Sequence, residues 1–216
     1  MYAKSAKYYL YWIKHLLLIV NALVVIWLVS GISLQLYEFR DSDPDRGAIM
    51  NGTDKFGDRF SQVTYLAQGW SASDSLWFYN TSQGSNLLPY SFFLVLEQSD
   101  SSALFRSDEN IDRYGYLPQR PTISNPDGLP VGMVRDRYQG KNYMGFTCAA
   151  CHTTQINYAG TGMRIDGGPA NSDMESFMID LANALYATLE NPDKLDRFMI
   201  QVLKQGDYQN ANHIID

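Results

Sequence analysis

One group of residues has a spacing typical of covalent chemistry, Cys148-Ala149-Ala150-Cys151-His152. Two cysteines separated by two residues and followed at once by histidine form the C-x-x-C-H pattern of haem c attachment. Each thiol can add to one vinyl group of the haem, and the His152 imidazole can bind the iron as proximal ligand. The motif therefore predicts one covalent haem c at Cys148 and Cys151, with His152 as the metal ligand.

Three other interpretations of these cysteines are a zinc site, a redox dithiol and a disulfide. A structural zinc site needs about four ligands, and the chain offers only His15 and His213 besides His152. A thioredoxin-like pair belongs near a βαβ pattern, and we expect no alternating strands around the motif. A disulfide across so short a loop would stabilise the fold little. Haem attachment is the favoured interpretation.

The elements that position this motif begin with an N-terminal hydrophobic segment. Leu16–Leu36 contains no charged residue and is close to the ~20 apolar residues that cross a bilayer as a helix. Lysines precede this segment and acidic residues follow it, a bias that places residues 1–15 in the cytoplasm. We expect a single-pass inner-membrane anchor over residues 16–36 and a haem domain in the periplasm. A signal peptide cleaved near Val29-Ser30-Gly31 is the alternative.

Helices dominate the rest of the expected structure, and the predicted fold class is mainly α. Residues 37–57 are polar and rich in turn residues, which is typical of a tether. Residues 58–140 are expected to form a helical and proline-rich extension, with helical spacing from Asp58 and extended loop over residues 115–140. Residues 141–216 are expected to form a helical, loop-rich haem domain of cytochrome c type.

Within the haem domain, a glycine-rich loop and two helices follow the motif. The loop covers residues 158–171 and should border the haem, because glycines let a backbone approach the ring closely. A capping box at Ser172–Glu175 starts the first helix. Asn191-Pro192 starts the second helix, which Gly206 ends.

Composition limits the partners that the protein can have. The chain of 216 residues has a net charge of −6 at pH 7 and no basic stripe, so nucleic acid is not expected. Both cysteines lie in the motif, which excludes a disulfide framework. The expected partners are the membrane, through the N-terminal segment, and either a redox partner protein or a small oxidisable substrate.

Four motifs between Trp77 and Phe198 carry a resemblance to a known family. They are Leu87-Leu88-Pro89-Tyr90, Asn125-Pro126-Asp127-Gly128-Leu129-Pro130-Val131-Gly132, Gly145-Phe146-Thr147-Cys148-Ala149-Ala150-Cys151-His152-Thr153 and Arg164-Ile165-Asp166-Gly167-Gly168-Pro169. This region resembles the rubber oxygenase-like dihaem c-type cytochromes, which are related to the bacterial dihaem cytochrome c peroxidases. The resemblance implies a periplasmic or secreted haem oxidoreductase whose first haem sits at the C-x-x-C-H motif.

The sequence departs from this family in one large feature. The family carries a second C-x-x-C-H downstream, whereas no cysteine follows Cys151 here. We therefore expect either the N-terminal part of a longer protein or a relative with a single haem. A mechanism that needs two haems does not transfer to these residues.

The sixth iron position separates two classes of function. A methionine there makes the haem an electron carrier of raised potential, and an open position lets iron bind peroxide or dioxygen. Met163, in the glycine-rich loop, is the preferred methionine, since Met174, Met178 and Met199 lie on apolar helix faces where methionine usually packs. We expect an open or weakly held position, and so a haem peroxidase or oxygenase. A simple electron-transfer cytochrome and a non-catalytic assembly component are the alternatives.

Arg164 is a further candidate for cofactor binding. A guanidinium beside a haem can pair bidentately with a propionate carboxylate, and Asp166 could orient it. Spacing alone allows an ordinary loop arginine that is paired with Asp166 equally well. The family resemblance favours the haem role.

Overall fold

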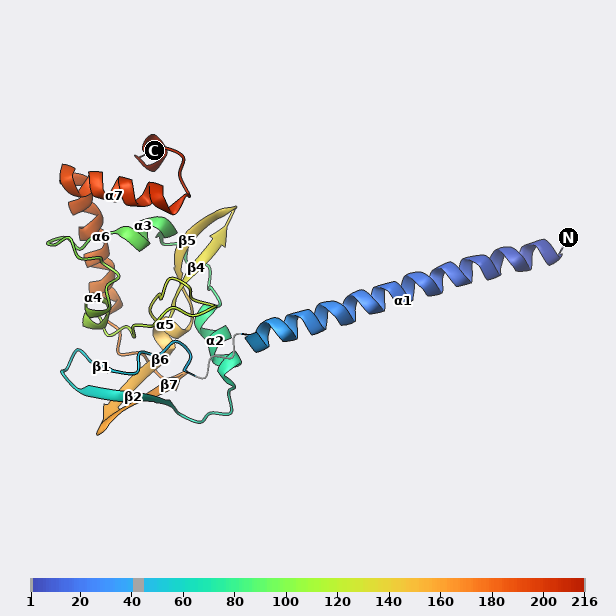
Figure 1. The fold of residues 1–216 in the computed structure, drawn as a ribbon, viewed down its shortest axis with the longest axis horizontal. Helices are drawn as coiled ribbons and strands as arrows, with labels where there is room; N and C mark the ends of the chain where they lie inside the picture. Colours follow the sequence, from blue (N-terminus) through green and yellow to red (C-terminus); the bar gives the residue numbers. More distant parts are fainter. Residues whose placement is uncertain (1, 41–44, 216) are drawn as a thin grey trace. The chain divides into compact units, whose positions relative to one another are not determined.

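The computed structural model describes residues 2–40 and 45–215 and divides the chain into two units, Met1–Ser42 and Asp43–Asp216. The first unit contains a single helix, α1 (Tyr2–Arg40), which extends beyond both ends of the predicted anchor (Figure 1). Tyr11–Leu34 is long and apolar enough to cross a membrane, and its most apolar part is not buried within the protein. The protein therefore has one N-terminal helix suited to a membrane.

The second unit combines helices and strands (Figure 1). Its helices are α2 (Ala72–Asn80), α3 (Tyr90–Val95), α4 (Asp108–Arg113), α5 (Ala149–His152), α6 (Met174–Glu190), α7 (Pro192–Gln205) and α8 (Asn212–Ile215). Its strands are β1 (Gly52–Thr53), β2 (Arg59–Tyr65), β3 (Leu88–Pro89), β4 (Met133–Tyr138), β5 (Lys141–Phe146), β6 (Thr153–Tyr158) and β7 (Gly160–Asp166).

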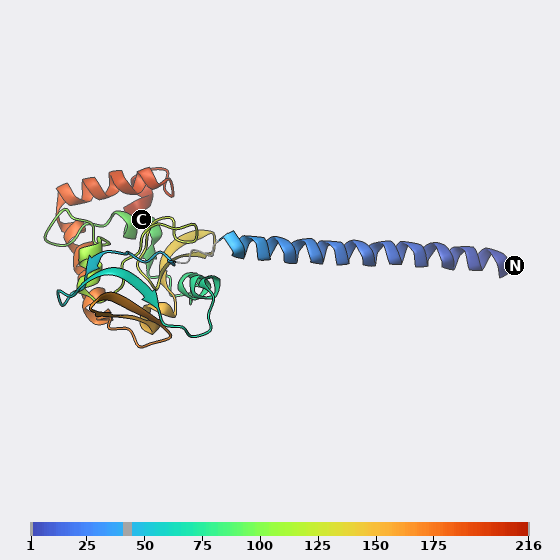
Figure 2. The same cartoon turned by 60° about the horizontal axis from the view of Figure 1, so that its bottom comes forward.

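The strands form two sheets. The first has the order β1-β2-β7-β6, in which β2 pairs with β7 in parallel and the other pairs are antiparallel. The second has the order β3-β5-β4 and is antiparallel throughout. Figure 2 shows the first sheet on the opposite side of the unit from α7. The two sheets join segments on either side of residue 140, where the sequence predicts a boundary between extension and haem domain.

The prediction of a mainly α fold with a cytochrome c-like domain is wrong. Residues 58–66 carry apolar residues at roughly helical spacing, but the segment forms β2. Val63 is buried, Phe60 and Tyr65 are half-buried, and the polar residues between them are exposed. A short segment of this kind fits the period of a helix or of a strand, so the pairing with a partner strand determines which of the two it forms. Here the partner is β7, about a hundred residues away in the chain.

The glycine-rich stretch 158–171 also differs from its prediction as a loop. A tight turn at Ala159 and Gly160, with φ of 48° and 80°, reverses the chain from β6 into β7. Only the segment after Asp166 is loop. β4 likewise lies inside the proline-rich region that was expected to be irregular.

The polar segment predicted as a tether is partly ordered. Residues 37–40 continue α1, residues 41–44 lie outside the described residues, and residues 45–57 are part of the second unit. Ala48 is fully buried and forms a bridge with Gln119. The end of this segment therefore belongs to the folded unit.

The helices after the motif follow their sequence signals. The Asp173 side chain accepts a hydrogen bond from Ser176 N at the start of α6, one residue later than predicted. Asn191 caps α7 with Pro192 in the first turn, and Gly206 ends it in the left-handed region with φ of 83°. The start and end of α7 are confirmed, because caps and helix stops are encoded by residues that are close in sequence. The capping box predicted at Ser172 and Glu175 is not formed, because Asp173 caps α6 instead.

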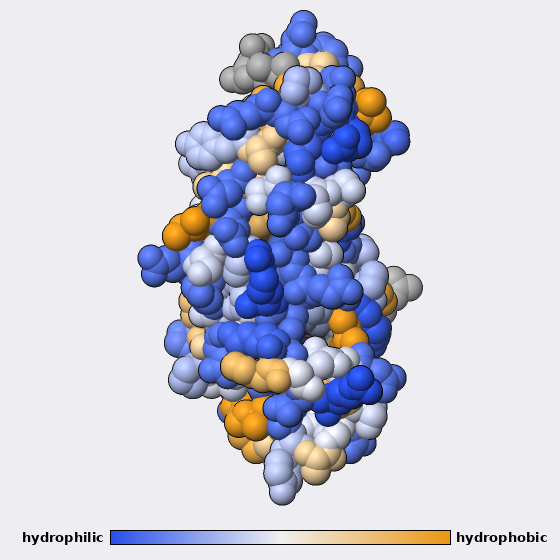
Figure 3. All heavy atoms as spheres, turned by 90° about the vertical axis from the view of Figure 1, so that its left-hand side faces the viewer, coloured by the Kyte–Doolittle hydropathy of each residue, from blue (hydrophilic) through white to orange (hydrophobic). Residues whose placement is uncertain are grey.

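Aromatic residues make the centre of the core. Phe177 of α6 is fully buried, and its ring contacts Phe105, Tyr114, Tyr116 and Phe146. Burial of one such side chain stabilises a fold by roughly 1.5–3 kcal/mol. The cluster ties α6 to β5 directly before the motif. The face in Figure 3 is mostly hydrophilic with small separate apolar patches.

Candidate functional site

The C-x-x-C-H residues are divided between the surface and the interior. Cys148, Cys151 and His152 are exposed, whereas Ala149 and Ala150 are each 1% exposed and pack inward. Both cysteines are free thiols. In the described part of the chain the His152 ring forms no hydrogen bond, so its nitrogens are available. The donor set and its exposure fit a haem c joined to this face.

Gly132 allows the motif to dock. Its φ is 88°, and an added Cβ would lie 2.2 Å from both the backbone nitrogen and the Cα of Ala150. The carbonyl of Gly132 also accepts a hydrogen bond from Thr147 N at 2.9 Å. A side chain at this position would collide with backbone, so the close approach of the two segments requires glycine.

The segment after β7 caps the motif. The C-terminal carbonyls of a helix lack partners within the helix. The carbonyl of His152 accepts from Gly167 N at 2.7 Å, and that of Cys151 accepts from Ala170 N at 2.9 Å. Ser172 Oγ donates to the Ala150 carbonyl at 3.3 Å. The end of the predicted glycine-rich loop therefore contacts the motif backbone, and its proximity to a haem stays a prediction.

Strands do flank the motif, contrary to the sequence-based expectation. β5 ends at Phe146, and β6 begins at Thr153 directly after α5. The two strands belong to different sheets, whereas a βαβ unit joins parallel strands of one sheet. The setting is therefore not thioredoxin-like in its topology, although the order of elements is strand, helix, strand.

Met163 and Arg164 point to opposite faces of the first sheet. Neighbouring side chains on a strand alternate between the two faces, and β7 follows this rule. Met163 is 42% exposed and lies across from Ile156, which is 55% exposed. Arg164 is 2% exposed and faces the interior. The structure does not bring these two candidate haem contacts together.

The other candidate methionines are on the last long helices. Met174 packs against the main core, and Met199 is half-buried. Met178 is 38% exposed on the outer side of α6. Packing therefore accounts for Met174 without an iron ligand.

A buried polar cluster surrounds Asp166. Its Oδ2 accepts hydrogen bonds from Ser75 Oγ and from Arg46 Nη1, the latter at 3.3 Å, and its Oδ1 accepts from Tyr79 OH. Burial raises the pKa of Tyr79 well above its usual value, so this phenol remains a donor. Asp166 therefore pairs with Arg46, not with Arg164. Sequence reasoning missed Arg46, Ser75 and Tyr79, which no local pattern connects to Asp166.

Arg164 contacts neutral groups beside this cluster. Its Nε and Nη2 donate to Gln155 Oε1 at 3.3 and 3.0 Å, and its Nη1 lies 3.5 Å from Tyr65 OH. Burial raises the pKa of Tyr65, which keeps the phenol neutral. The Arg46 guanidinium stacks over the Tyr65 ring at 4.0 Å. The buried group thus holds two guanidinium ions and one carboxylate.

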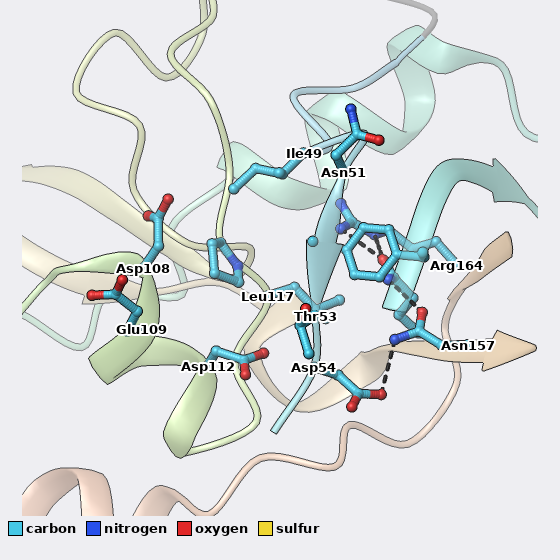
Figure 4. A pocket seen from close by; sticks show the side chains of 14 residues that line it. Ile49, Asn51, Thr53, Asp54, Asp108, Glu109, Asp112, Leu117, Asn157 and Arg164 are labelled. Atoms are coloured by element: carbon cyan, nitrogen blue, oxygen red, sulfur yellow. Dashed lines mark hydrogen bonds between the residues drawn. The ribbon is translucent and has the colours of Figure 1, made fainter. Parts of the chain in front are cut away.

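Arg164 also lines the cavity shown in Figure 4, whose volume is about 330 Å³. Asp108, Glu109 and Asp112 of α4 lie on the opposite side of it from Arg164. Burial, helped by the negative charge of Asp54, raises the pKa of Asp112 to about 6. No three metal-ligating side chains converge among residues 2–40 and 45–215, in this cavity or elsewhere.

No family model and no solved structure matches the chain. Among curated proteins, it is 32% identical over 167 residues to the uncharacterized protein y4iJ of Sinorhizobium fredii. The match covers 67% of this chain and 27% of that protein, so the chain spans about a quarter of the relative's length. The name of the relative assigns no activity.

Proposed function

We propose that the protein is a membrane-anchored c-type cytochrome with one covalent haem at Cys148 and Cys151 and with His152 as proximal iron ligand. The exposure pattern of the motif carries this proposal, since both thiols and the imidazole are accessible while the two alanines anchor α5. A haem at this position supplies one-electron chemistry and, where an axial position is open, binding of peroxide or dioxygen.

The surrounding residues position the motif. Gly132 lets α5 sit close against the neighbouring backbone, and Gly167 and Ala170 hold its last carbonyls. A backbone held from two sides keeps the two thiols and the imidazole at fixed separations, which attachment to a rigid macrocycle requires. These contacts support a positioning role for Gly132.

The proposed class is a haem oxidoreductase of the dihaem peroxidase or oxygenase type, acting with a redox partner protein or a small oxidisable substrate. The resemblance in the four motifs supports it, as does the packing of Met174 against the core. The alternative is an electron-transfer cytochrome with Met163 as sixth ligand. Met163 is exposed on β7, in the stretch that follows the motif, which supports it as the ligand in that alternative.

The proposed location is the inner membrane, with α1 as anchor and the second unit in the periplasm. The apolar stretch Tyr11–Leu34 supports the anchor, and the lysines before it support a cytoplasmic N-terminus. The C-x-x-C-H motif supports the same orientation, because covalent haem attachment is expected on the exported side.

The attachment is tested on the full chain in detergent, produced in cells that mature c-type cytochromes. The denatured protein should keep its haem through acid-acetone extraction and give a c-type pyridine haemochrome. Cys148→Ala with Cys151→Ala should lose the haem, and His152→Ala should lose the native spectrum while the matched variant His213→Ala keeps it. Haem that acid-acetone extracts from the unsubstituted protein refutes covalent attachment.

The sixth position is tested by mixing the reduced protein with carbon monoxide. An open or weakly held position predicts rapid binding, and Met163→Leu should then leave the rate unchanged. A methionine-to-iron charge-transfer band together with no carbon monoxide binding would reverse the preference. Loss of that band in Met163→Leu would then identify the ligand of an electron carrier.

A further inference from the structure

The cavity of Figure 4 separates charges of opposite sign that would otherwise pair. Arg164 of β7 is on one side, and the carboxylates of Asp108, Glu109 and Asp112 are on the other. Within the described residues none of these four side chains forms an ion pair. Arg164 is therefore buried without an ion-pair partner, whereas Asp108 and Glu109 are exposed and Asp112 is half-buried.

Burial of the unpaired Arg164 charge costs more free energy than exposure of the α4 carboxylates to solvent. Arg164 is 2% exposed, and its hydrogen bonds reach only the amide oxygen of Gln155 and the phenol of Tyr65. The nearby carboxylate of Asp166 is already shared among Arg46, Ser75 and Tyr79. A buried charge without an opposite charge is expensive, so an anion that reaches Arg164 through the cavity gains a strong contact.

Two cations near the negative wall, Lys55 and Arg106, keep their charge but hydrogen-bond to carbonyl oxygens and form no ion pair with the α4 carboxylates in the described part of the chain. Lys55 Nζ donates to the Asn171 carbonyl at 3.2 Å, and Arg106 donates to the carbonyls of Leu94 and Asp127 at 3.0 and 2.8 Å. The remaining carboxylate of the lining, Asp54, accepts from Asn157 at 2.8 Å. The three α4 carboxylates thus face the cavity as acceptors for a cation.

We propose that this cavity binds a small zwitterion, with its carboxylate on Arg164 and its ammonium group toward the α4 carboxylates. The volume of about 330 Å³ lies within the range of small-molecule sites. Ile49, Phe60 and Leu117 supply an apolar lining for a short methylene chain between the two charged ends. This proposal does not depend on the haem.

The first test measures binding of a length series to the full chain in detergent at pH 7. The probes are glycine, β-alanine, 4-aminobutanoate and 5-aminopentanoate, with butanoate and butylamine as matched single-charge probes. Ligand-observed NMR should show at least one zwitterion binding about tenfold or more tighter than both single-charge probes, which corresponds to the loss of one good charged contact. The proposal is overturned if butanoate binds as tightly as every zwitterion. It is also overturned if no zwitterion binds.

The second test uses paired variants of the two walls. Asp108→Asn with Glu109→Gln changes exposed side chains and should weaken the preferred zwitterion about tenfold without weakening butanoate. Arg164→Gln should weaken both. The controls Asp196→Asn and Arg137→Gln, at exposed positions outside the lining, should change neither.

Folding is checked by circular dichroism for each variant. If Arg164→Gln does not fold, the α4 variant alone decides. An unchanged zwitterion affinity in that folded variant refutes the proposed ammonium contact and overturns the proposal.

Discussion

The C-x-x-C-H motif and the Asp166 cluster bring their residues together in opposite ways. The motif is five consecutive residues, and its reactive side chains are exposed. The cluster joins Asp166 to partners 120, 91 and 87 residues away, and its carboxylate is 3% exposed. Chemistry in the first is a property of local spacing, whereas charge pairing in the second exists only after the chain has folded.

The two regions are nevertheless connected through one β-pairing. Asp166 lies across from Thr153, the residue that follows the motif, and Gly167 N donates to the His152 carbonyl. The cluster thus holds the end of β7 in place, and the end of β7 holds the motif. We infer that the exposed site takes its geometry from the buried one, so changes in the cluster should cost stability and changes in the motif should cost chemistry.

The largest expected effect is that of Asp166→Ala. Removing the carboxylate leaves Arg46 buried and unpaired, in addition to two hydroxyl donors, and this should lower the free energy of unfolding by about 3–5 kcal/mol. Urea denaturation of the full chain in detergent measures it. The control Asp180→Ala breaks the exposed pair with Arg113 and should cost about 1 kcal/mol or less. Equal losses in both variants would refute the distinction between buried and exposed pairs.

Gly132→Ala should have the second-largest effect on stability, because it disturbs the contact between Gly132 and the motif backbone at Ala150. The left-handed backbone costs an alanine roughly 1–2 kcal/mol, and the collision with Ala150 adds to it. Gly140→Ala is the matched control, since Gly140 has a φ of 80° and open space around it. The difference between the two variants in thermal unfolding isolates the collision. A Gly132→Ala protein no less stable than the control contradicts the close approach.

Local signals in the sequence predicted some elements of the fold, whereas long-range pairing determined the others. The cap at Asn191 and the stop at Gly206 depend on residues a few positions apart, so they were predicted correctly, and the N-cap of α6 lies one residue after the predicted Ser172. β2 was misassigned, because its half-buried Phe60 and Tyr65 fit a helix until β7 supplies a partner. The glycines of residues 158–171 suggested a loop, although Ala159 and Gly160 need only one turn to form a hairpin.

The candidate site shows the same limit. Arg164 was identified from its motif, but its neighbours Gln155 and Tyr65 and its place in the cavity follow from sheet register. The alternation of Met163 and Arg164 becomes visible only once residues 160–166 are known to be a strand. Pairing of Asp166 with Arg46 had no local signal at all.

Asp112, on the wall of the cavity, makes the free energy of unfolding depend on pH. The folded protein raises the pKa of Asp112 from 3.8 to about 6, first through burial, so it binds this proton more tightly than the unfolded chain does. Its contribution is therefore fully present below pH 3.8 and is lost as the pH rises through 6. Asp112→Asn should be more stable than the parent at pH 7, by up to about 1 kcal/mol after allowance for solvent screening. The two proteins should converge near pH 4 in urea titrations, and a constant difference across this range would contradict the assigned shift.

The smallest expected effect on stability belongs to the motif itself. Cys148→Ser with Cys151→Ser changes only exposed side chains and keeps the buried alanines that anchor α5. In protein produced without haem, the free energy of unfolding should stay within about 0.5 kcal/mol of the parent. Ala150→Ser is the matched substitution at an interior position of the same helix, and it should cost more because a hydroxyl then enters the core. If the cysteine pair proved the more damaging of the two, the thiols would have a structural role, and the separation between an exposed site of chemistry and a buried support would fail.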